Sequence, residues 1–148
     1  MLIRAAVPGD IDEMLALAEA SQSAAHWNAR EYEALFAPEA PKRIATVAAL
    51  HSGEIAGFVI ARCGDEEWEI ENVVVARKHQ RQGIGTRLID EVVSSARQAG
   101  VRSVLLEVRE SNPAARSLYE KAGFSEEGRR SRYYTQPEED AVLLRLVL

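Results

Sequence analysis

The chain reads Gln80-Arg81-Gln82-Gly83-Ile84-Gly85-Thr86 after the apolar run Val73–Ala76 and before the helical pattern Leu88–Ala96. This order of strand, glycine-rich turn and helix leaves several backbone N–H groups unpaired at one point, and the helix dipole makes that point positive. Such a turn binds anions, and a pyrophosphate is the usual ligand. Gly83 and Gly85 let the backbone approach that ligand without a Cβ in the way. The segment therefore predicts an anion site, with an ordinary strand-to-helix turn as the alternative.

The spacing of the two glycines excludes the common nucleotide-binding loops. A P-loop carries a Lys-Ser/Thr pair after its last glycine, whereas Ile84 and Gly85 follow Gly83 here. A Rossmann turn needs a third glycine at the place where Arg87 or Leu88 stands. Basic side chains surround the turn and suit a polyphosphate: Arg77, Lys78, Arg81 and Arg87.

Length and composition indicate one globular domain, 1–148. The chain has 148 residues, of which 47% are hydrophobic and 28% are charged, enough for a sizeable core. No apolar run approaches the length of a membrane span, and Met1–Ala5 lacks the long apolar region of a signal peptide. We therefore expect a cytoplasmic protein without a membrane partner, and a monomer or weak dimer.

The charged residues and the cysteine content narrow the function classes. The formal net charge of −5 argues against nonspecific nucleic-acid binding, which depends on neutralising phosphates. The one cysteine, Cys63, excludes an internal disulfide and is expected to be a buried, inert thiol. The histidines lack ligand spacing, so no metal is expected: His26, His51 and His79.

The apolar periodicity predicts an α/β (α+β) fold with a mixed, mostly antiparallel sheet of about seven strands and about four helices on both faces. Strands are expected at 2–6, 44–50, 55–63, 68–75, 101–108, 124–134 and 140–148, and helices at 11–18, 29–36, from the glycine turn to Gly100, and at 113–123. The order of strand, helix and strand around Gly100 implies a parallel crossover.

Polar residues and prolines predict where the first helices begin and end. Asp10, with Glu13 at the third position after it, is expected to cap the first helix. Asn28 is expected to cap the second, and Pro38 and Pro41 to end it.

These motifs together resemble the GCN5-related N-acetyltransferases. Gln80-x-x-Gly83-x-Gly85 after a buried strand is similar to the acetyl-CoA signature of that family, and Leu106–Phe124 is similar to its next strand and helix. The resemblance covers most of Val73–Phe124, and the order of elements matches over the whole chain. It implies the family's fold and the use of acetyl-CoA as cosubstrate.

One branch of that family is more similar, the RimI-type enzymes that acetylate the N-terminal residue of a ribosomal protein. The shared features are Leu106–Arg109, Asn112, Leu118–Glu120, Tyr133-Tyr134 after Arg129-Arg130, Trp27 and Glu139–Ala141. The resemblance implies a protein N-terminus as acceptor, that of ribosomal protein S18. Acetylation of a small amine (polyamine, amino acid or antibiotic) or of a lysine, and a non-catalytic acyl-CoA sensor, stay open as alternatives.

The resemblance also implies which residues hold the cosubstrate. The backbone of Val73, Val74 and Val75 would pair with its pantetheine arm. Asn112 would touch that arm, or cap its own helix instead. The pyrophosphate would lie on the backbone amides of Arg81, Gln82, Gly83, Ile84, Gly85 and Thr86.

The catalytic and acceptor-binding residues follow from the same resemblance. Glu107 is expected to act as the base through a water molecule, with Glu69 as its rival, or to pair with Arg109 or Arg102 instead. Tyr119 is expected to protonate the leaving thiolate, because its phenol is protonated at neutral pH, or to be a core tyrosine. Aromatic side chains would wall the acceptor groove, or simply pack: Trp27, Tyr133 and Tyr134.

Overall fold

A seven-stranded mixed sheet forms the centre of the computed structural model, which describes residues 1–21, 24–25, 27–39, 42–135 and 138–148. The strands lie in the order β1-β2-β3-β4-β5-β7-β6. They are β1 (Leu2–Ala5), β2 (Arg43–Ala49), β3 (Ile55–Cys63), β4 (Glu67–Val75), β5 (Ser103–Arg109), β6 (Ser125–Thr135) and β7 (Glu138–Val147). Neighbours pair antiparallel except β4 and β5, which are parallel. The predicted mixed, mostly antiparallel sheet and its parallel crossover are therefore confirmed.

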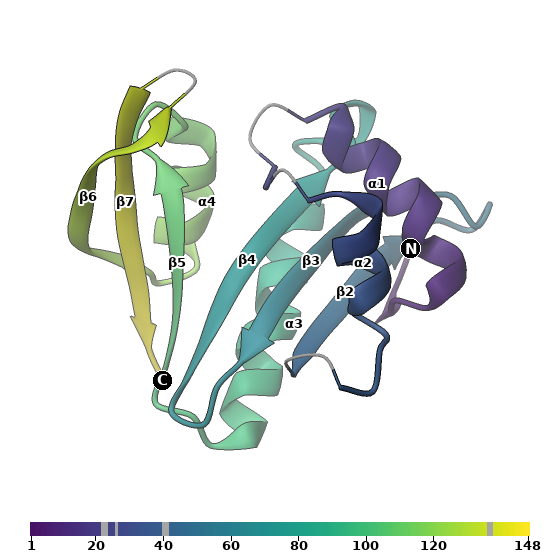
Figure 1. Ribbon diagram of the computed structural model, residues 1–148, viewed down its shortest axis with the longest axis horizontal. Coiled ribbons are helices and arrows are strands. Elements are labelled where there is room, and N and C mark those ends of the chain that lie inside the picture. The colour runs from purple at the N-terminus through teal and green to yellow at the C-terminus, as the bar shows by residue number, and fades with distance from the viewer. Residues whose placement is uncertain (22–23, 26, 40–41, 136–137) are drawn as a thin grey trace.

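Helices cover both faces of the sheet, as predicted. They are α1 (Ile11–Glu19), α2 (Ala29–Ala34), α3 (Ile84–Ala99) and α4 (Pro113–Lys121). In Figure 1, α1 and α2 lie on one face of β2–β4, and α3 lies on the other. One apolar core, with Met14, Tyr32 and Phe58, lies beneath α1 and α2, and a second, with Leu88 and Val92, lies beneath α3.

Local sequence signals predicted the C-terminal end of α3 and the N-terminal cap of α2. Gly100 ends α3 in the left-handed conformation (φ 77°), which glycine adopts without a Cβ penalty. Asn28 caps α2, because its side chain accepts a hydrogen bond from the Glu31 N–H at 2.9 Å. The helix ends at Ala34, ahead of Pro38, and Pro41 lies outside the described residues.

Asp10 stands at the N-cap position of α1, as predicted, but its side chain makes no capping hydrogen bond. The Asp10 carboxylate instead accepts two hydrogen bonds from Arg4, at 2.8 and 3.0 Å, and one from the Val7 N–H at 2.9 Å. Glu13 accepts a hydrogen bond from the Ile55 N–H at 2.5 Å. The guanidinium of Arg4 binds both oxygens of Asp10, and such a bidentate pair is stronger than a single hydrogen bond. Arg4 and the Ile55 N–H both come from other elements, so no local pattern predicts these contacts.

The strands β4 and β5 diverge after a short stretch of pairing. Their parallel register runs from Glu67↔Ser103 to Ile70↔Leu106. A β-bulge follows in β4, since Ile70 pairs with Ala61 of β3 and Asn72 with Ile60, which leaves Glu71 as the extra residue. A bulge bends its strand and increases the local twist. From Asn72 to Val75, β4 therefore pairs with β3 alone, and Figure 1 shows β4 and β5 spreading apart.

Candidate active site

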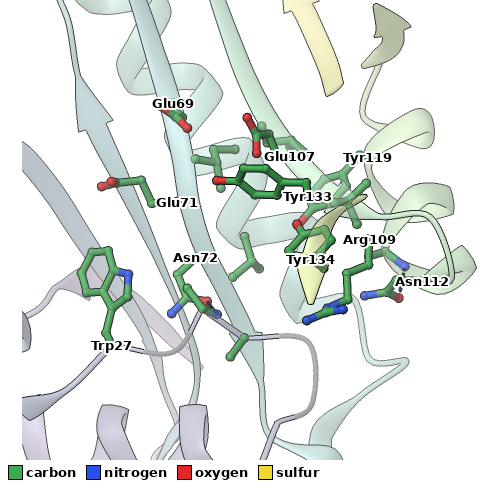
Figure 2. A pocket seen from close by; sticks show the side chains of 17 residues that line it. Trp27, Glu69, Glu71, Asn72, Glu107, Arg109, Asn112, Tyr119, Tyr133 and Tyr134 are labelled. Atoms are coloured by element: carbon green, nitrogen blue, oxygen red, sulfur yellow. Dashed lines mark hydrogen bonds between the residues drawn. The ribbon is translucent and has the colours of Figure 1, made fainter. Parts of the chain in front are cut away.

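A cavity of about 360 Å³ lies where β4 and β5 diverge. Its walls come from β4, β5, α4, the β6 strand end and the segment before α2 (Figure 2). Many of the residues singled out in the sequence line it: Trp27, Glu69, Val73, Glu107, Asn112, Tyr119, Tyr133 and Tyr134. Residues far apart in the sequence thus meet at one place, as a catalytic site requires.

Beyond Ile70, every second residue of β4 directs its backbone N–H and C=O groups toward the edge that β5 no longer covers. The Ala76 N–H donates to the Ala56 carbonyl at 2.7 Å, so by antiparallel alternation Val74 also bonds to β3. Val73 and Val75 then direct their N–H and C=O groups to the side that β5 has left. The Gln80 side-chain amide donates to the Val75 carbonyl at 3.4 Å from that side. The Val74 side chain is buried beneath α1 and α2.

Glu107 is a half-buried carboxylate in the cavity wall. Its Oε1 lies 3.2 Å from Arg130 Nε, and 16% of its side chain is exposed. Burial raises its pKa above the ordinary value, Arg130 opposes that shift, and Glu69 adds to it. The pairing expected with Arg109 or Arg102 is not formed, because Arg130 takes that place and Arg109 pairs with Glu139 at 2.9 Å.

Two glutamates of β4 that line the cavity are each held by an arginine, Glu69 by Arg62 of the adjacent β3 and Glu71 by Arg43 of β2. Glu69 accepts from Arg62 at 2.7 Å, and 30% of its side chain is exposed. Glu71 accepts two bonds from Arg43, at 2.6 and 3.2 Å. The Arg43 guanidinium also lies 5.6 Å from the ring centroid of Trp27. Both candidate bases thus have an arginine partner, but the pair of Glu69 is shorter, 2.7 Å against 3.2 Å, and Glu107 is the more buried carboxylate. Glu107 and Tyr119 line the same cavity (Figure 2).

Tyr119 is a buried phenol that still lines the cavity. Burial, and then the neighbouring Tyr134, raise its pKa to about 12. The phenol is therefore protonated throughout the neutral range and is a hydrogen-bond donor. Its ring packs edge-on against Phe124 with centroids 6.0 Å apart, so the packing role and the cavity position are both present.

The tyrosine pair and Asn112 complete the wall on the α4 side. The rings of Tyr133 and Tyr134 lie 5.2 Å apart, and the Arg109 guanidinium lies 4.0 Å from the Tyr134 centroid. Asn112 caps α4, since its Oδ1 accepts from the Ala115 N–H at 3.2 Å, and it also lines the cavity. The helix-capping alternative for Asn112 is therefore real and does not remove it from the site.

The glycine turn lies outside the cavity lining and begins α3. Arg81 and Gly83 both have positive φ, 64° and 79°, and α3 starts without a side-chain cap, so the first-turn N–H groups keep free hydrogens. Alternating left-handed residues make a concave, anion-binding arrangement of N–H groups. A Cβ on Gly85 would lie 3.1 Å from Leu118 Cδ2, so this glycine also allows α3 to pack closely against α4.

Sequence reasoning missed Glu71, Asn72 and Arg130. Asn72 is buried, accepts from the Ala25 N–H at 3.2 Å and donates to Tyr32 Oη at 3.4 Å. A buried asparagine inside an apolar strand was the available signal, because such a group must find partners. Arg130 belongs to the pair Arg129-Arg130 that contributed to the resemblance, but nothing in that pair indicates a contact with Glu107.

Comparison with known proteins places the chain in a family. The profile of the Acetyltransferase (GNAT) family matches residues 11–124. The chain belongs to the GNAT acetyltransferase family. It is therefore an N-acetyltransferase, and enzymes of this family use acetyl-CoA.

Individual relatives agree with that assignment. The chain is 35% identical over 116 residues to the [ribosomal protein bS18]-alanine N-acetyltransferase of Escherichia coli K12, covering 77% of this chain and 78% of the relative. It is 40% identical over 103 residues to the N-alpha-acetyltransferase RimI of Mycobacterium tuberculosis, covering 67% and 63%. The crystal structure of the Escherichia coli ribosomal-protein-S18-alanine N-acetyltransferase superposes with a TM-score of 0.85 at 28% identity, covering 99% and 92%.

Two further features concern membranes and metals. Of the helices described, none has the length and apolarity needed to cross a membrane. Within the described ranges, no three His, Cys, Asp or Glu side chains gather closely enough to hold a metal ion; His26 lies outside those ranges.

Proposed function

We propose that this N-acetyltransferase transfers an acetyl group from acetyl-CoA to the N-terminal α-amine of a protein, and that the protein is ribosomal protein S18. The observation that carries the chemistry is that Glu107, from β5, and Tyr119, from α4, line one cavity beside the open edge of β4. The names of the bacterial relatives support the acceptor. Residues 1–148 would act as one domain, in the cytoplasm and without nucleic acid, as a monomer or weak dimer.

The open edge and the glycine turn fit acetyl-CoA. A pantetheine arm carries amides that pair with free backbone groups, which Val73 and Val75 direct outward. A pyrophosphate suits the unpaired N–H groups at the start of α3, where Arg81 and Gly83 have positive φ. Only the backbone of Ile84 is available, because its side chain is buried in the core.

The residues of the cavity supply the proton transfers. Bound acetyl-CoA supplies an activated thioester, whose C–S bond breaks as the amine forms the new C–N bond. A free α-amine has a pKa of about 7.7–8.0, so a carboxylate such as Glu107, acting through a water molecule, suffices to take the proton that it loses. Tyr119 donates its phenolic proton to the departing sulfur and regains one from solvent.

The acceptor end of the cavity suits a peptide N-terminus. Trp27 on one side and Tyr133 and Tyr134 on the other are large, rigid contact surfaces with little rotamer entropy to lose. The carboxylates of Glu69 and Glu71 also line the cavity, and their oxygens keep lone pairs beyond those used by Arg62 and Arg43 that can accept hydrogen bonds from an incoming amine.

Release of CoA with two peptides tests this proposal. One peptide copies the N-terminus of mature ribosomal protein S18 with a free amine. The other has the same residues and an added lysine behind a blocked N-terminus. We expect turnover with the first alone. Turnover with the second alone would make the chain a lysine acetyltransferase, and silence with both, while acetyl-CoA still binds, would point to a small amine or a sensor.

A further inference from the structure

The rings of Tyr133 and Tyr134 pack edge to face against each other in the cavity wall, a contact that consecutive residues of a regular strand do not make. Side chains of neighbouring strand residues point to opposite faces of a sheet. Tyr133 and Tyr134 nevertheless both line the cavity, with their rings 5.2 Å apart. The register of β6 against β7 explains this. Arg130 pairs with Ala141 and Tyr134 with Glu139, so the whole segment Ser131–Tyr133 stands opposite Asp140. We call this segment the β6 bulge.

The β6 bulge depends on an unfavourable backbone conformation. Arg132, in its middle, has a φ of 52°, in the left-handed region that glycine and asparagine tolerate and arginine does not favour. The Asp140 carboxylate accepts a hydrogen bond from the Arg132 N–H at 3.0 Å. A backbone N–H that would lack a ladder partner in the bulge is thus satisfied by the side chain directly opposite.

The two residues that flank the bulge, Arg130 and Tyr134, contact residues of the cavity wall. Arg130, at its start, places Nε 3.2 Å from Glu107 Oε1 and its guanidinium 5.3 Å from the Tyr133 ring centroid. At its end, Tyr134 lies beneath Arg109. A change in the bulge therefore moves the aromatic wall relative to Glu107, while the glycine turn at the start of α3 is untouched.

We propose that Asp140 is a positioning residue for the acceptor: by holding Arg132 in the left-handed conformation, it turns Tyr133 and Tyr134 together into the acceptor end of the cavity. Asp140 itself does not line the cavity. The inference rests on the proposed function, since it assumes that this end of the cavity receives the peptide amine. It assigns a specificity role to Asp140, two positions after the first residue of β7, and to the exposed Arg132.

Backbone preference, rather than charge, is what the experiment must isolate. Arg132→Gly and Arg132→Val remove the same guanidinium, which pairs with Glu138 at 3.1 Å. Glycine accepts a positive φ without strain, whereas a β-branched residue does not. Asp140→Asn keeps an oxygen that accepts the bond, and Asp140→Ala removes it. The double variant Asp140→Ala/Arg132→Gly removes both the bond and the need for it.

Steady-state kinetics of the full chain with the free-amine peptide give the readout. We expect Asp140→Ala and Arg132→Val to raise the KM for the peptide by about tenfold. That factor corresponds to the free-energy cost of holding one non-glycine residue in the left-handed conformation. Their kcat and their KM for acetyl-CoA should change far less. Asp140→Asn, Arg132→Gly and the double variant should stay close to wild type.

Three results would overturn the inference. Equal behaviour of Arg132→Val and Arg132→Gly would show that the backbone conformation is irrelevant. A double variant as weak as Asp140→Ala would give Asp140 another role. An equal rise in the KM for acetyl-CoA would mean a general structural defect.

Failure of the proposed function would look different, because wild type itself would not acetylate the peptide. Amide hydrogen exchange at the Arg132 N–H then decides the role of Asp140. Protection in wild type and Asp140→Asn but fast exchange in Asp140→Ala supports the hydrogen bond as the device that holds the bulge. Equal exchange in all of them refutes it.

Discussion

Replacing Tyr119 with phenylalanine separates the proposed proton donor from the packing of the same ring. Phenylalanine keeps the ring, its edge contact with Phe124 at 6.0 Å and its position in the cavity wall. Only the hydroxyl is lost. Because the pKa of Tyr119 is about 12, about one phenol in 10⁴ is ionised at pH 8, so nearly every wild-type molecule carries the proton that the variant lacks.

The expected loss of turnover is large. Removal of a general acid costs about 10²–10⁴ in rate, which corresponds to about 2.7–5.5 kcal/mol in the barrier. A hydrogen bond to a charged group contributes about 1.5–3 kcal/mol, so simple loss of such a bond would already reach the lower part of that range. We therefore expect kcat to fall at least about 100-fold, with little change in the KM for acetyl-CoA.

The stability of the variant should hardly change. The causes of the Tyr119 pKa shift are burial and Tyr134, and no hydrogen bond from its hydroxyl to another described residue contributes. Tyr119→Phe therefore leaves no described partner unsatisfied, and we expect the free energy of unfolding to stay within about 0.5 kcal/mol. Tyr32→Phe is the matched control, because Tyr32 is fully buried and its Oη accepts from Asn72 at 3.4 Å. It should lose about 1 kcal/mol of stability and far less activity.

CoA release and thermal unfolding together read out both variants. For a domain of this size, 1 kcal/mol shifts Tm by roughly 2–4 °C, which a thermal scan resolves. A Tyr119→Phe enzyme with near-normal kcat would refute the proton-donor role and leave Tyr119 as a packing residue. A loss of kcat that comes with a lowered Tm would attribute the effect to folding instead.

Three further predictions concern the base, the glycine turn and stability. Glu107→Gln should lower kcat/KM for the peptide most at low pH; unchanged activity there would move the base to Glu69. A base acts in its deprotonated form, so activity should fall as the pH drops through the pKa of Glu107. Arg130 lowers that pKa, so Arg130→Gln should move the acidic limb of the pH–rate profile to higher pH. Glu69 raises that pKa, so Glu69→Gln should move the same limb to lower pH. Gly83→Val should raise the KM for acetyl-CoA by about tenfold or more, because valine does not favour the positive φ of 79° that shapes the turn. The control Gly53→Val, at φ 90° in the β2–β3 turn, should leave that KM unchanged. Equal KM values in the two variants would refute the pyrophosphate assignment. Asp10→Asn should cost about 1–3 kcal/mol at neutral pH, measured by denaturant unfolding. Arg4 lowers the pKa of Asp10, so this stabilisation is complete above the unfolded pKa of about 3.9 and is lost as pH falls through the lower folded value; a difference between wild type and variant that persists in acid would contradict the ion pair as its source.

Elements whose signals are local could be predicted from the sequence. β3 has the predicted bounds, 55–63, and the other strands differ by a few residues at their ends. Gly100 and Asn28 interact with residues one helical turn away, so their roles can be predicted from the local sequence. Asp10 and Glu13 show the limit: both have the right spacing for a cap, but Arg4 and the Ile55 N–H compete for them in the folded chain.

The candidate site was predictable only in part, for the same reason. The motif segments carried Glu107, Tyr119 and Asn112, which the fold does bring to one cavity. The sequence does not reveal that Arg130, rather than Arg109, stands beside Glu107, because the choice depends on the register of β6 against β7. A register is set by packing over the whole sheet, and a shift of one residue reverses every side chain.

One inserted residue, Glu71, explains why the apolar pattern of β4 changes half-way. Trp68 and Ile70 belong to the core on the α3 face, whereas Val74 belongs to the core beneath α1 and α2. In a regular strand these even-numbered residues would share one face. The bulge turns every later side chain over, so that Val73 packs toward the α3 core instead.

The same inversion creates the polar wall of the site. Without the bulge, Asn72 would face the apolar α3 core, where its amide would lack partners and cost free energy. With it, Glu69, Glu71 and Asn72 all line the cavity, and Asn72 bonds to Tyr32 and to the Ala25 N–H. The bulge lies directly after Ile70, the last β4 residue that pairs with β5. One residue therefore ends the pairing that would close the edge of β4 and aims the polar groups into the space that opens.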